Sequence, residues 1–388
     1  MRDPHLDKLA DVLVNFSTRV KPGELVRLSG DPVAMPLLEA LYEAVVRAGG
    51  HPYLKCAPAD CRDFFLQEAS DEQLGYLNPI LVKEVEAIDV SIGLWADVNT
   101  KSSTRLDPKR AARAGAAQKP IRELFFKRAA AHEAPHEHPG VKPLRWVGAQ
   151  FPTHASAQDA EMSLREYCDF VFKAGLLHLA DPAAAWEKVR VRQQLVADYM
   201  TGKKEMRFRT NNGTDLRVNI DGMRWINCWG ESNFPDGEVF TGPNLKAAGG
   251  GVNGLVRYSF PAVYQGHEVH DIEFVFEKGK VVEAKASKGL EFLTAMLDQD
   301  PGARFVGEVA MGTNYSIKQY SKNTLFDEKI GGTFHLAVGA GYPETGNANQ
   351  SALHWDMVCD MRTGGTIEVD GVVIQRDGKF VFEGWPGE

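Results

Sequence analysis

The sequence predicts an α/β protein of two domains, in which an open, mostly parallel sheet domain precedes a β-rich α+β domain. Over the first 200 residues, helix-like and strand-like hydrophobic periods alternate, which is typical of β-α-β units. Beyond that point, strand-like runs joined by Asp-Gly and related turns dominate, which is typical of antiparallel hairpins. We therefore expect an N-terminal α/β domain at residues 1–200 and a β-rich α+β domain at residues 201–388.

In the first domain, predicted strands and predicted helices alternate along the chain, as the connections of a parallel sheet require. A glycine pair, Gly49-Gly50, marks the end of the second helical pattern. Helical patterns are expected at residues 5–18, 36–47 and 108–131, with a further helical stretch after residue 56, and strands at 24–28, 51–56, 87–95 and 144–151. Strands separated by helices in this way predict a parallel sheet covered by helices.

The second domain follows a helical region at residues 182–200. Its first strand, at 215–220, alternates strictly after an Asn-Asn-Gly turn. A hairpin is expected about Lys278-Gly279, and two Asp-Gly hairpins are expected between residues 366 and 381. The clearest helical pattern in this half is at 288–297. Gly249-Gly-Gly-Val-Asn-Gly254 fits the dinucleotide fingerprint formally, but a strand-like run follows it, so we interpret it as a turn.

Composition excludes several classes of protein. The net charge of −8 disfavours nucleic-acid binding, which depends on neutralising phosphates. No stretch reaches the roughly 18 apolar residues of a membrane span, and the charged N-terminus lacks the core of a signal peptide. The five cysteines are odd in number and form no C-x-x-C pair, which favours reduced thiols. We expect a cytoplasmic protein that binds neither nucleic acid nor membrane.

Ionisable residues within apolar runs of the second domain indicate a site. Glu308, His335, His354 and Asp356 all lie in such runs, and Glu238 opens the run Glu-Val-Phe after a turn. A buried carboxylate needs an ion pair, several donors or a metal. In a strand, His354 and Asp356 share one face because they are two residues apart.

These five residues, here called the five candidate ligands, offer oxygen and nitrogen donors suited to one or two divalent ions such as Zn²⁺, Mn²⁺ or Co²⁺. Three carboxylates contribute −3, which two divalent ions more than offset. Each residue also has a structural interpretation. A single histidine in a strand is often a core residue bonded to a carbonyl, Glu308 can pair with Arg304, and His-x-Asp recurs by chance.

Four runs in the second half also resemble the aminopeptidase T and aminopeptidase S type of metallo-aminopeptidases. The matching runs, in the order and spacing of that family, are 234–243, 305–310, 325–339 and 349–357. The resemblance implies a two-domain, homodimeric peptidase with a dinuclear metal site. It places the family's ligands on the five candidate ligands and the family's oxyanion-binding tyrosine on Tyr342. This chain departs from many relatives in having Gly237, and not an acidic residue, before Glu238.

We therefore expect a metal-dependent aminopeptidase that uses two divalent ions (Zn, Co or Mn) and acts on peptides with a free N-terminus. Glu308 is the candidate for proton transfer to the leaving amine, and Tyr342 is the expected donor to the oxyanion. Two alternatives remain open. One is a mononuclear iron ring-cleaving dioxygenase on the same scaffold, with His335, His354 and Asp356 as its triad. The other is a non-catalytic protein that binds a small ligand.

Overall fold

The chain folds into two compact units in the computed structural model, which describes residues 2–102 and 104–387. One unit runs to Ala183 and includes Gly230–Pro235, and the other comprises Ala184–Trp229 and the chain from Asp236 onward. This division differs from the boundary expected at residue 200. The helix α10 (Pro182–Met200) buries Val196, Ala197 and Met200 in the core of the second unit, so almost all of it belongs there.

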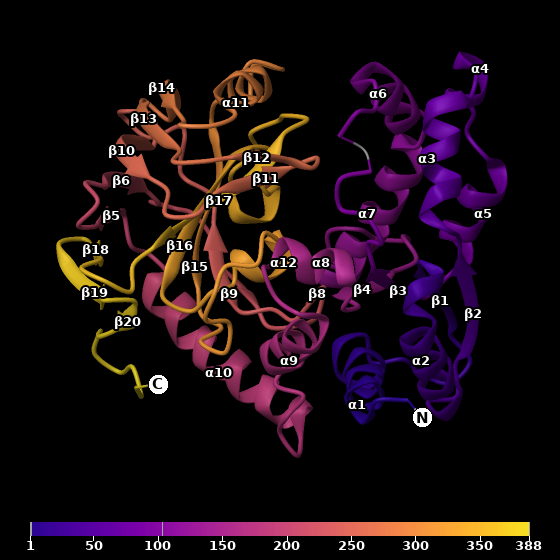
Figure 1. Ribbon diagram of the computed structural model, residues 1–388. Coiled ribbons are helices and arrows are strands. Elements are labelled where there is room, and N and C mark those ends of the chain that lie inside the picture. Colours follow the sequence, from indigo (N-terminus) through magenta and orange to yellow (C-terminus); the bar gives the residue numbers. More distant parts are fainter. Residues whose placement is uncertain (1, 103, 388) are drawn as a thin grey trace. The chain divides into compact units, whose positions relative to one another are not determined.

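A five-stranded parallel sheet forms the centre of the first unit, in the order β2-β1-β3-β4-β8 (Figure 1). Its strands are β1 (Leu25–Gly30), β2 (His51–Cys56), β3 (Val90–Trp95), β4 (Arg145–Gln150) and β8 (Asn233–Phe234). The helices of this unit are α1 (Pro4–Asp11), α2 (Met35–Arg47), α3 (Ala59–Glu68), α4 (Asp71–Leu74), α5 (Pro79–Ala87), α6 (Pro108–Ala117), α7 (Lys119–Glu133), α8 (His154–Asp159) and α9 (Leu164–Ala174). The parallel α/β domain expected from the sequence is confirmed.

Two antiparallel sheets and a two-stranded ribbon form the second unit. The larger sheet has the order β14-β13-β10-β6-β5-β18-β19-β20, the smaller has the order β17-β16-β15-β9-β7, and β11 pairs with β12. The strands of the larger sheet are β5 (Glu205–Arg209), β6 (Asp215–Asn219), β10 (Val252–Arg257), β13 (Glu273–Glu277), β14 (Lys280–Lys285), β18 (Thr366–Val369), β19 (Val372–Arg376) and β20 (Lys379–Phe380). The others are β7 (Ile226–Cys228), β9 (Glu238–Thr241), β15 (Val306–Gly312), β16 (Thr333–Gly339), β17 (His354–Asp360), β11 (Ala262–Tyr264) and β12 (His267–Val269).

Apolar side chains of both antiparallel sheets share one core. Phe208 of β5 stacks on Phe334 of β16 with ring centroids 4.2 Å apart. The helix α10 covers part of this core, and its Gln193 side chain donates a hydrogen bond to the Glu238 carbonyl of β9. The rest of the unit contains α11 (Leu290–Leu297), which was expected, and the four-residue α12 (Thr324–Asp327), which was not. The predicted β-rich α+β character is confirmed.

Local turn chemistry accounts for the hairpins. The pairs Lys278-Gly279, Asp370-Gly371 and Asp377-Gly378 all have positive φ angles at both residues, as a type I′ turn requires. They join β13 to β14, β18 to β19 and β19 to β20, as predicted. The glycine-rich run before β10 is a turn that leads into a strand, so the context of a dinucleotide site is absent there. In the described parts of the chain, every helix is too short or too polar to span a lipid bilayer.

A partly buried ion-pair network fixes α5 to the parallel sheet. The Glu84 carboxylate, 14% exposed, accepts hydrogen bonds from Arg27 at 3.0 Å and from Lys55 at 2.6 Å. Burial alone would raise the pKa of Glu84, but the two cations hold it below its ordinary value. The folded state therefore stabilises the ionised carboxylate.

Replacing Glu84 by glutamine is expected to destabilise the protein by about 1–3 kcal/mol at neutral pH, because Arg27 and Lys55 lose their buried acceptor. The pKa of Glu84 is lower in the folded protein than in the unfolded chain, where it is about 4.3. The ionised Glu84 therefore stabilises the folded state fully above the unfolded pKa, and this contribution is lost as the pH falls through the folded pKa. Thermal unfolding at several pH values measures this. The matched control is Glu86→Gln on the same helix, which removes an exposed pair with Lys83. An equal loss of stability in both variants would contradict the prediction.

Candidate metal centre

The register of the smaller sheet places the five candidate ligands on one face. Strand β15 pairs with β9 so that Gly312 lies opposite Glu238. Glu308 is four residues before Gly312 on β15, and residues an even number apart in a strand share a face. Glu238 and Glu308 therefore lie on the same side of the sheet. Glu308 lies opposite Ala337, and Ala337 lies opposite Asp356. His335 is two residues from Ala337, and His354 is two residues from Asp356, so both imidazoles point to the same side as Glu308. Residues from four neighbouring strands thus meet.

The two imidazoles lie between the carboxylates. His335 Nε2 is 3.3 Å from Glu238 Oε2 and 3.4 Å from Glu308 Oε1. His354 Nε2 is 3.3 Å from Glu308 Oε2 and 3.6 Å from Asp356 Oδ1. Glu308 therefore directs one oxygen toward each histidine. His335 is fully buried, whereas the His354 side chain is 28% exposed, so solvent reaches the cluster at His354.

Two overlapping groups have the geometry of a cation site. Ligand atoms of Glu238, Glu308 and His335 all lie within 4.8 Å of one another, and so do those of Glu308, His354 and Asp356. Glu308 belongs to both groups. The structure thus brings all five candidate ligands together, and it does so in two sets that share a carboxylate.

Buried oxygen atoms in this cluster lack hydrogen bonds. Within the described chain, Glu238 Oε2 and Asp356 Oδ1 accept none, although both are shielded from solvent. Leaving a buried carboxylate oxygen without a donor is costly. A divalent cation satisfies such oxygens directly, and carboxylate and imidazole together suit Zn²⁺, Co²⁺ or Mn²⁺. The residues therefore fit a metal site.

Electrostatics in the cluster favour charged imidazoles and an ionised Glu308. Burial alone would lower the pKa of both histidines, but the carboxylates raise it to about 9 for His335 and about 10 for His354. Burial alone would raise the pKa of Glu308, but both imidazoles lower it to about 2. Burial raises the pKa of Asp356 to about 6 and that of Glu238 to about 8, against the opposing charges of nearby cations. Since a ligating imidazole must be neutral, a metal ion bound here would take the place of these protons.

Tyr342 lies beside the exposed histidine. Its hydroxyl oxygen is 3.5 Å from His354 Nε2, and its ring contacts the rings of His354 and Phe240 edge-on, with centroids 5.2 Å and 5.1 Å away. Burial and the neighbouring carboxylates, Glu308 first among them, raise the pKa of Tyr342 above its ordinary value. The hydroxyl therefore keeps its proton and is available as a hydrogen-bond donor.

A β-bulge positions Glu308. The register of β15 against β16 shifts between Val306 and Glu308, leaving Gly307 as the extra residue. A Cβ atom on Gly307 would lie 2.0 Å from the Ala340 carbonyl oxygen and 2.5 Å from its carbon. The backbone of the loop that leads to Tyr342 thus approaches β15 so closely that only glycine fits here.

A cation and two carboxylates that no sequence pattern predicted adjoin this cluster. Lys329, which follows α12 and is fully buried, forms ion pairs with Glu238 and Glu328, and its Nζ lies 3.9 Å from Asp236 Oδ1. Burial alone would lower the pKa of Lys329, but Glu238, Glu328 and Asp236 raise it well above its ordinary value. The run Asp327-Glu328-Lys329 resembles an exposed turn, and only its apolar neighbours on both sides hint at burial.

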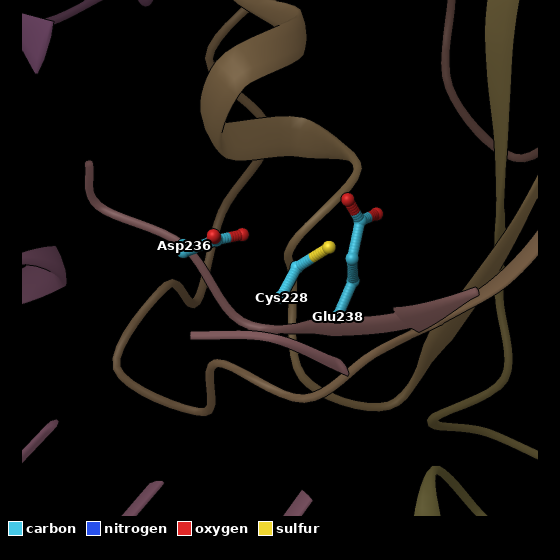
Figure 2. A group of neighbouring side chains, drawn as sticks. All are labelled: Cys228, Asp236 and Glu238. Atoms are coloured by element: carbon cyan, nitrogen blue, oxygen red, sulfur yellow. The ribbon is translucent and has the colours of Figure 1, made fainter. Parts of the chain in front are cut away.

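Asp236, Glu238 and Cys228 form a further group whose ligand atoms lie within 4.8 Å of one another. Figure 2 shows the Cys228 side chain between those of the two acids. Burial raises the pKa of the Cys228 thiol well above its ordinary value, and the nearby carboxylates raise it further. Cys228 is therefore a neutral thiol in the metal-free protein.

Comparisons with known proteins give matches over most of the chain. A family model described as thermophilic metalloprotease (M29) matches residues 2–380. Aminopeptidase 2 of Geobacillus stearothermophilus is 26% identical, with 98% of each chain aligned, and Aminopeptidase T of Thermus thermophilus is 33% identical over 63% of this chain and 61% of its own.

Two solved structures share the fold over nearly the full length. Wild-type AmpT from Thermus thermophilus has a TM-score of 0.81 at 24% identity, with 98% of this chain and 99% of that chain covered. The 2,5-dihydroxypyridine dioxygenase from Pseudomonas putida KT2440 has a TM-score of 0.58 at 13% identity, with 98% of each chain covered.

Proposed function

The chain belongs to the thermophilic metalloprotease family (M29), a family of metal-dependent aminopeptidases, and we propose that it releases the N-terminal residue of peptides with the aid of two divalent metal ions. The observation that carries this proposal is the cluster of the five candidate ligands on one sheet face, with Glu308 shared between two groups. The names of the relatives support the choice of the N-terminal residue as the site of cleavage.

The charge of the cluster supports two ions. Five carboxylates gather here, since Asp236 and Glu328 add to Glu238, Glu308 and Asp356, and Lys329 offsets one of their charges. With neutral imidazoles a net charge of −4 remains, and two divalent ions neutralise it. Burying uncompensated charge is costly, so a single ion would leave the site unbalanced.

Ions held by the five candidate ligands would supply a water of lowered pKa and would polarise the scissile carbonyl. The chain's own groups complete the site. Tyr342 keeps its proton beside His354 and is placed to donate a hydrogen bond to the developing oxyanion. Glu308 is proposed as the ligand shared by both groups and as the candidate for carrying a proton to the leaving amine. Because both of its oxygens face imidazoles, the ligand role has the stronger support. Glu328 is the alternative proton carrier, since it lies near His335 and Asp356.

Further parts of the proposal concern the ion, the assembly and the compartment. Zn²⁺, Co²⁺ and Mn²⁺ all suit these ligands. The family resemblance implies a homodimer, which light scattering of the purified protein would detect. All five cysteines are free, which fits a cytoplasmic location.

The proposal is tested by counting metal ions per chain while measuring hydrolysis of a panel of aminoacyl p-nitroanilides. We expect two divalent ions per chain, and activity that a chelator removes and added metal restores. One iron per chain, together with oxygen consumption on a dihydroxy-aromatic, would favour the dioxygenase. Absence of both tightly bound metal and hydrolysis would favour a binding protein. The presence of Glu238 and Glu308 beside the two histidines and Asp356 counts against a three-residue iron triad.

Replacing Tyr342 by phenylalanine is expected to lower kcat by about 10²–10³-fold, the usual effect of losing one oxyanion donor, with little change in KM. Steady-state kinetics on an aminoacyl p-nitroanilide measures this. Tyr199→Phe is the matched control, because Tyr199 packs on Phe382 in the same unit and the substitution keeps its ring. A kcat near that of wild type in Tyr342→Phe would remove Tyr342 from the mechanism.

A further inference from the structure

We propose that Lys329 is a positioning residue whose ammonium group fills a third cation position, at Cys228, Asp236 and Glu238, and so presents a single oxygen of Glu238 to the metal centre. The inference rests on the proposed function, because it concerns how one of the proposed ligands is oriented. It assigns a task to a buried lysine that the mechanism above does not use.

The group at Cys228 has the composition of a metal site. A sulfur atom and two carboxylate oxygens within 4.8 Å of one another match the ligand types and spacing that Zn²⁺ or Co²⁺ accepts (Figure 2). Glu238 belongs both to this group and to the group with Glu308 and His335. By ligand geometry alone, a third divalent ion would therefore compete for Glu238.

Lys329 already supplies a positive charge at this position. Its Nζ is 2.7 Å from Glu238 Oε1 and 3.9 Å from Asp236 Oδ1, and it also donates to Glu328. The residue has no exposed surface, and a buried ammonium is tolerated only where carboxylates surround it, as they do here. An ammonium and a divalent ion cannot occupy the same carboxylates at once, so Lys329 excludes a metal from this group.

The same contact determines which oxygen of Glu238 faces the centre. Oε1 is taken by Lys329, whereas Oε2 accepts no hydrogen bond and lies 3.3 Å from His335 Nε2. The backbone beneath is fixed separately, since the Gln193 side chain donates to the carbonyl groups of Glu238 and Cys228. Gln193 therefore holds the backbone, and Lys329 holds the carboxylate.

Removing the ammonium should consequently have two effects that a purely structural lysine would not produce. The vacated group should accept a divalent ion through the Cys228 sulfur. The thermal stability of the variant should also depend more strongly on added metal, because its metal-free site has lost one compensating positive charge.

The first experiment loads wild type, Lys329→Ala and the double variant Lys329→Ala/Cys228→Ser with Co²⁺, and records metal per chain and the near-ultraviolet absorption of a Co²⁺–thiolate bond. We expect two ions and no thiolate band in wild type. We expect a third ion and a thiolate band in Lys329→Ala, both lost in the double variant. A thiolate band in wild type, or neither a band nor a third ion in folded Lys329→Ala, would overturn the proposal.

A second variant covers the case in which alanine prevents folding. Lys329→Gln keeps much of the volume and a hydrogen-bond donor but lacks the charge. We expect its Tm without metal to fall, and its rise in Tm on adding Co²⁺ to exceed that of wild type by several degrees. The control is Lys322→Gln, a mostly buried lysine that pairs with Glu268. An equal metal-induced rise in Lys329→Gln, Lys322→Gln and wild type would refute the positioning role.

The two proposals fail in different ways. If wild type binds no divalent ion and cleaves no peptide analogue, the proposed function fails. If wild type binds two ions and is active, but the Lys329 variants bind metal as wild type does, only the role of Lys329 fails.

Discussion

Replacement of Glu308 by glutamine is expected to abolish hydrolysis of aminoacyl p-nitroanilides. Glu308 directs one oxygen to each imidazole and belongs to both groups of ligand atoms, so the substitution weakens both halves of the centre at once. Proton transfer by one side chain contributes about 10²–10⁴-fold to the rate of a catalysed reaction. The loss of turnover in Glu308→Gln should exceed this factor, because the substitution also weakens metal binding. His354→Ala, which removes a ligand from one group only, should also abolish turnover.

Metal analysis of Glu308→Gln separates its two proposed roles. Loss of bound metal would identify Glu308 chiefly as a ligand, whereas full metal content without activity would identify it as the proton carrier. Glu283→Gln, which alters an exposed carboxylate paired with Lys285 on β14, is the control and should retain activity. Near-wild-type turnover by Glu308→Gln would remove the basis of the proposed function.

Replacement of Gly307 by alanine is the second change from which a large effect is expected. The new methyl group would meet the Ala340 carbonyl at 2.0 Å, and it would also lie 2.7 Å from the Gly339 carbonyl oxygen. These are backbone atoms, which cannot move without disturbing the pairing of β15 with β16. Overpacking in such a site costs about 1–3 kcal/mol or more. Because the bulge orients the next residue, Glu308, activity should fall together with Tm.

Gly115→Ala is the matched control for this prediction. Gly115 lies in α6 with no atom within 4 Å of its added Cβ, so alanine there should be neutral or stabilise the protein by about 0.5–1 kcal/mol. Thermal unfolding and turnover of both variants test the idea. It is contradicted if Gly307→Ala unfolds at the wild-type temperature and retains full activity.

Local signals in the sequence were enough to predict much of this fold. Turn pairs such as Asp370-Gly371 demand positive φ angles, and these residue types adopt them readily, so the hairpins follow from neighbouring residues alone. The five candidate ligands were identifiable for a related reason. Glu308 and His335 stand within apolar strands, where a charged group requires a partner.

Features that depend on distant pairing were not predictable in this way. The charged run that contains Lys329 resembles a solvated turn, and its burial depends on Glu238, 91 residues earlier in the chain. No sequence pattern shows which core receives the helical region at 182–200, so the division of the chain was expected at residue 200. The return of β8 to the parallel sheet likewise depends on its pairing with β4.

The order of strands in the smaller sheet has a consequence for how ions would leave the proposed metal centre. Glu308 and His335 are on interior strands, whereas His354 and Asp356 are on β17, which ends the sheet. Terminal strands open more readily than interior ones, and on β17 the His354 side chain is 28% exposed, whereas His335 is fully buried. In the proposed two-ion centre, exchange with the buffer should therefore begin at His354 and Asp356, and an ion held by Glu238, Glu308 and His335 should be the last to be lost during dialysis.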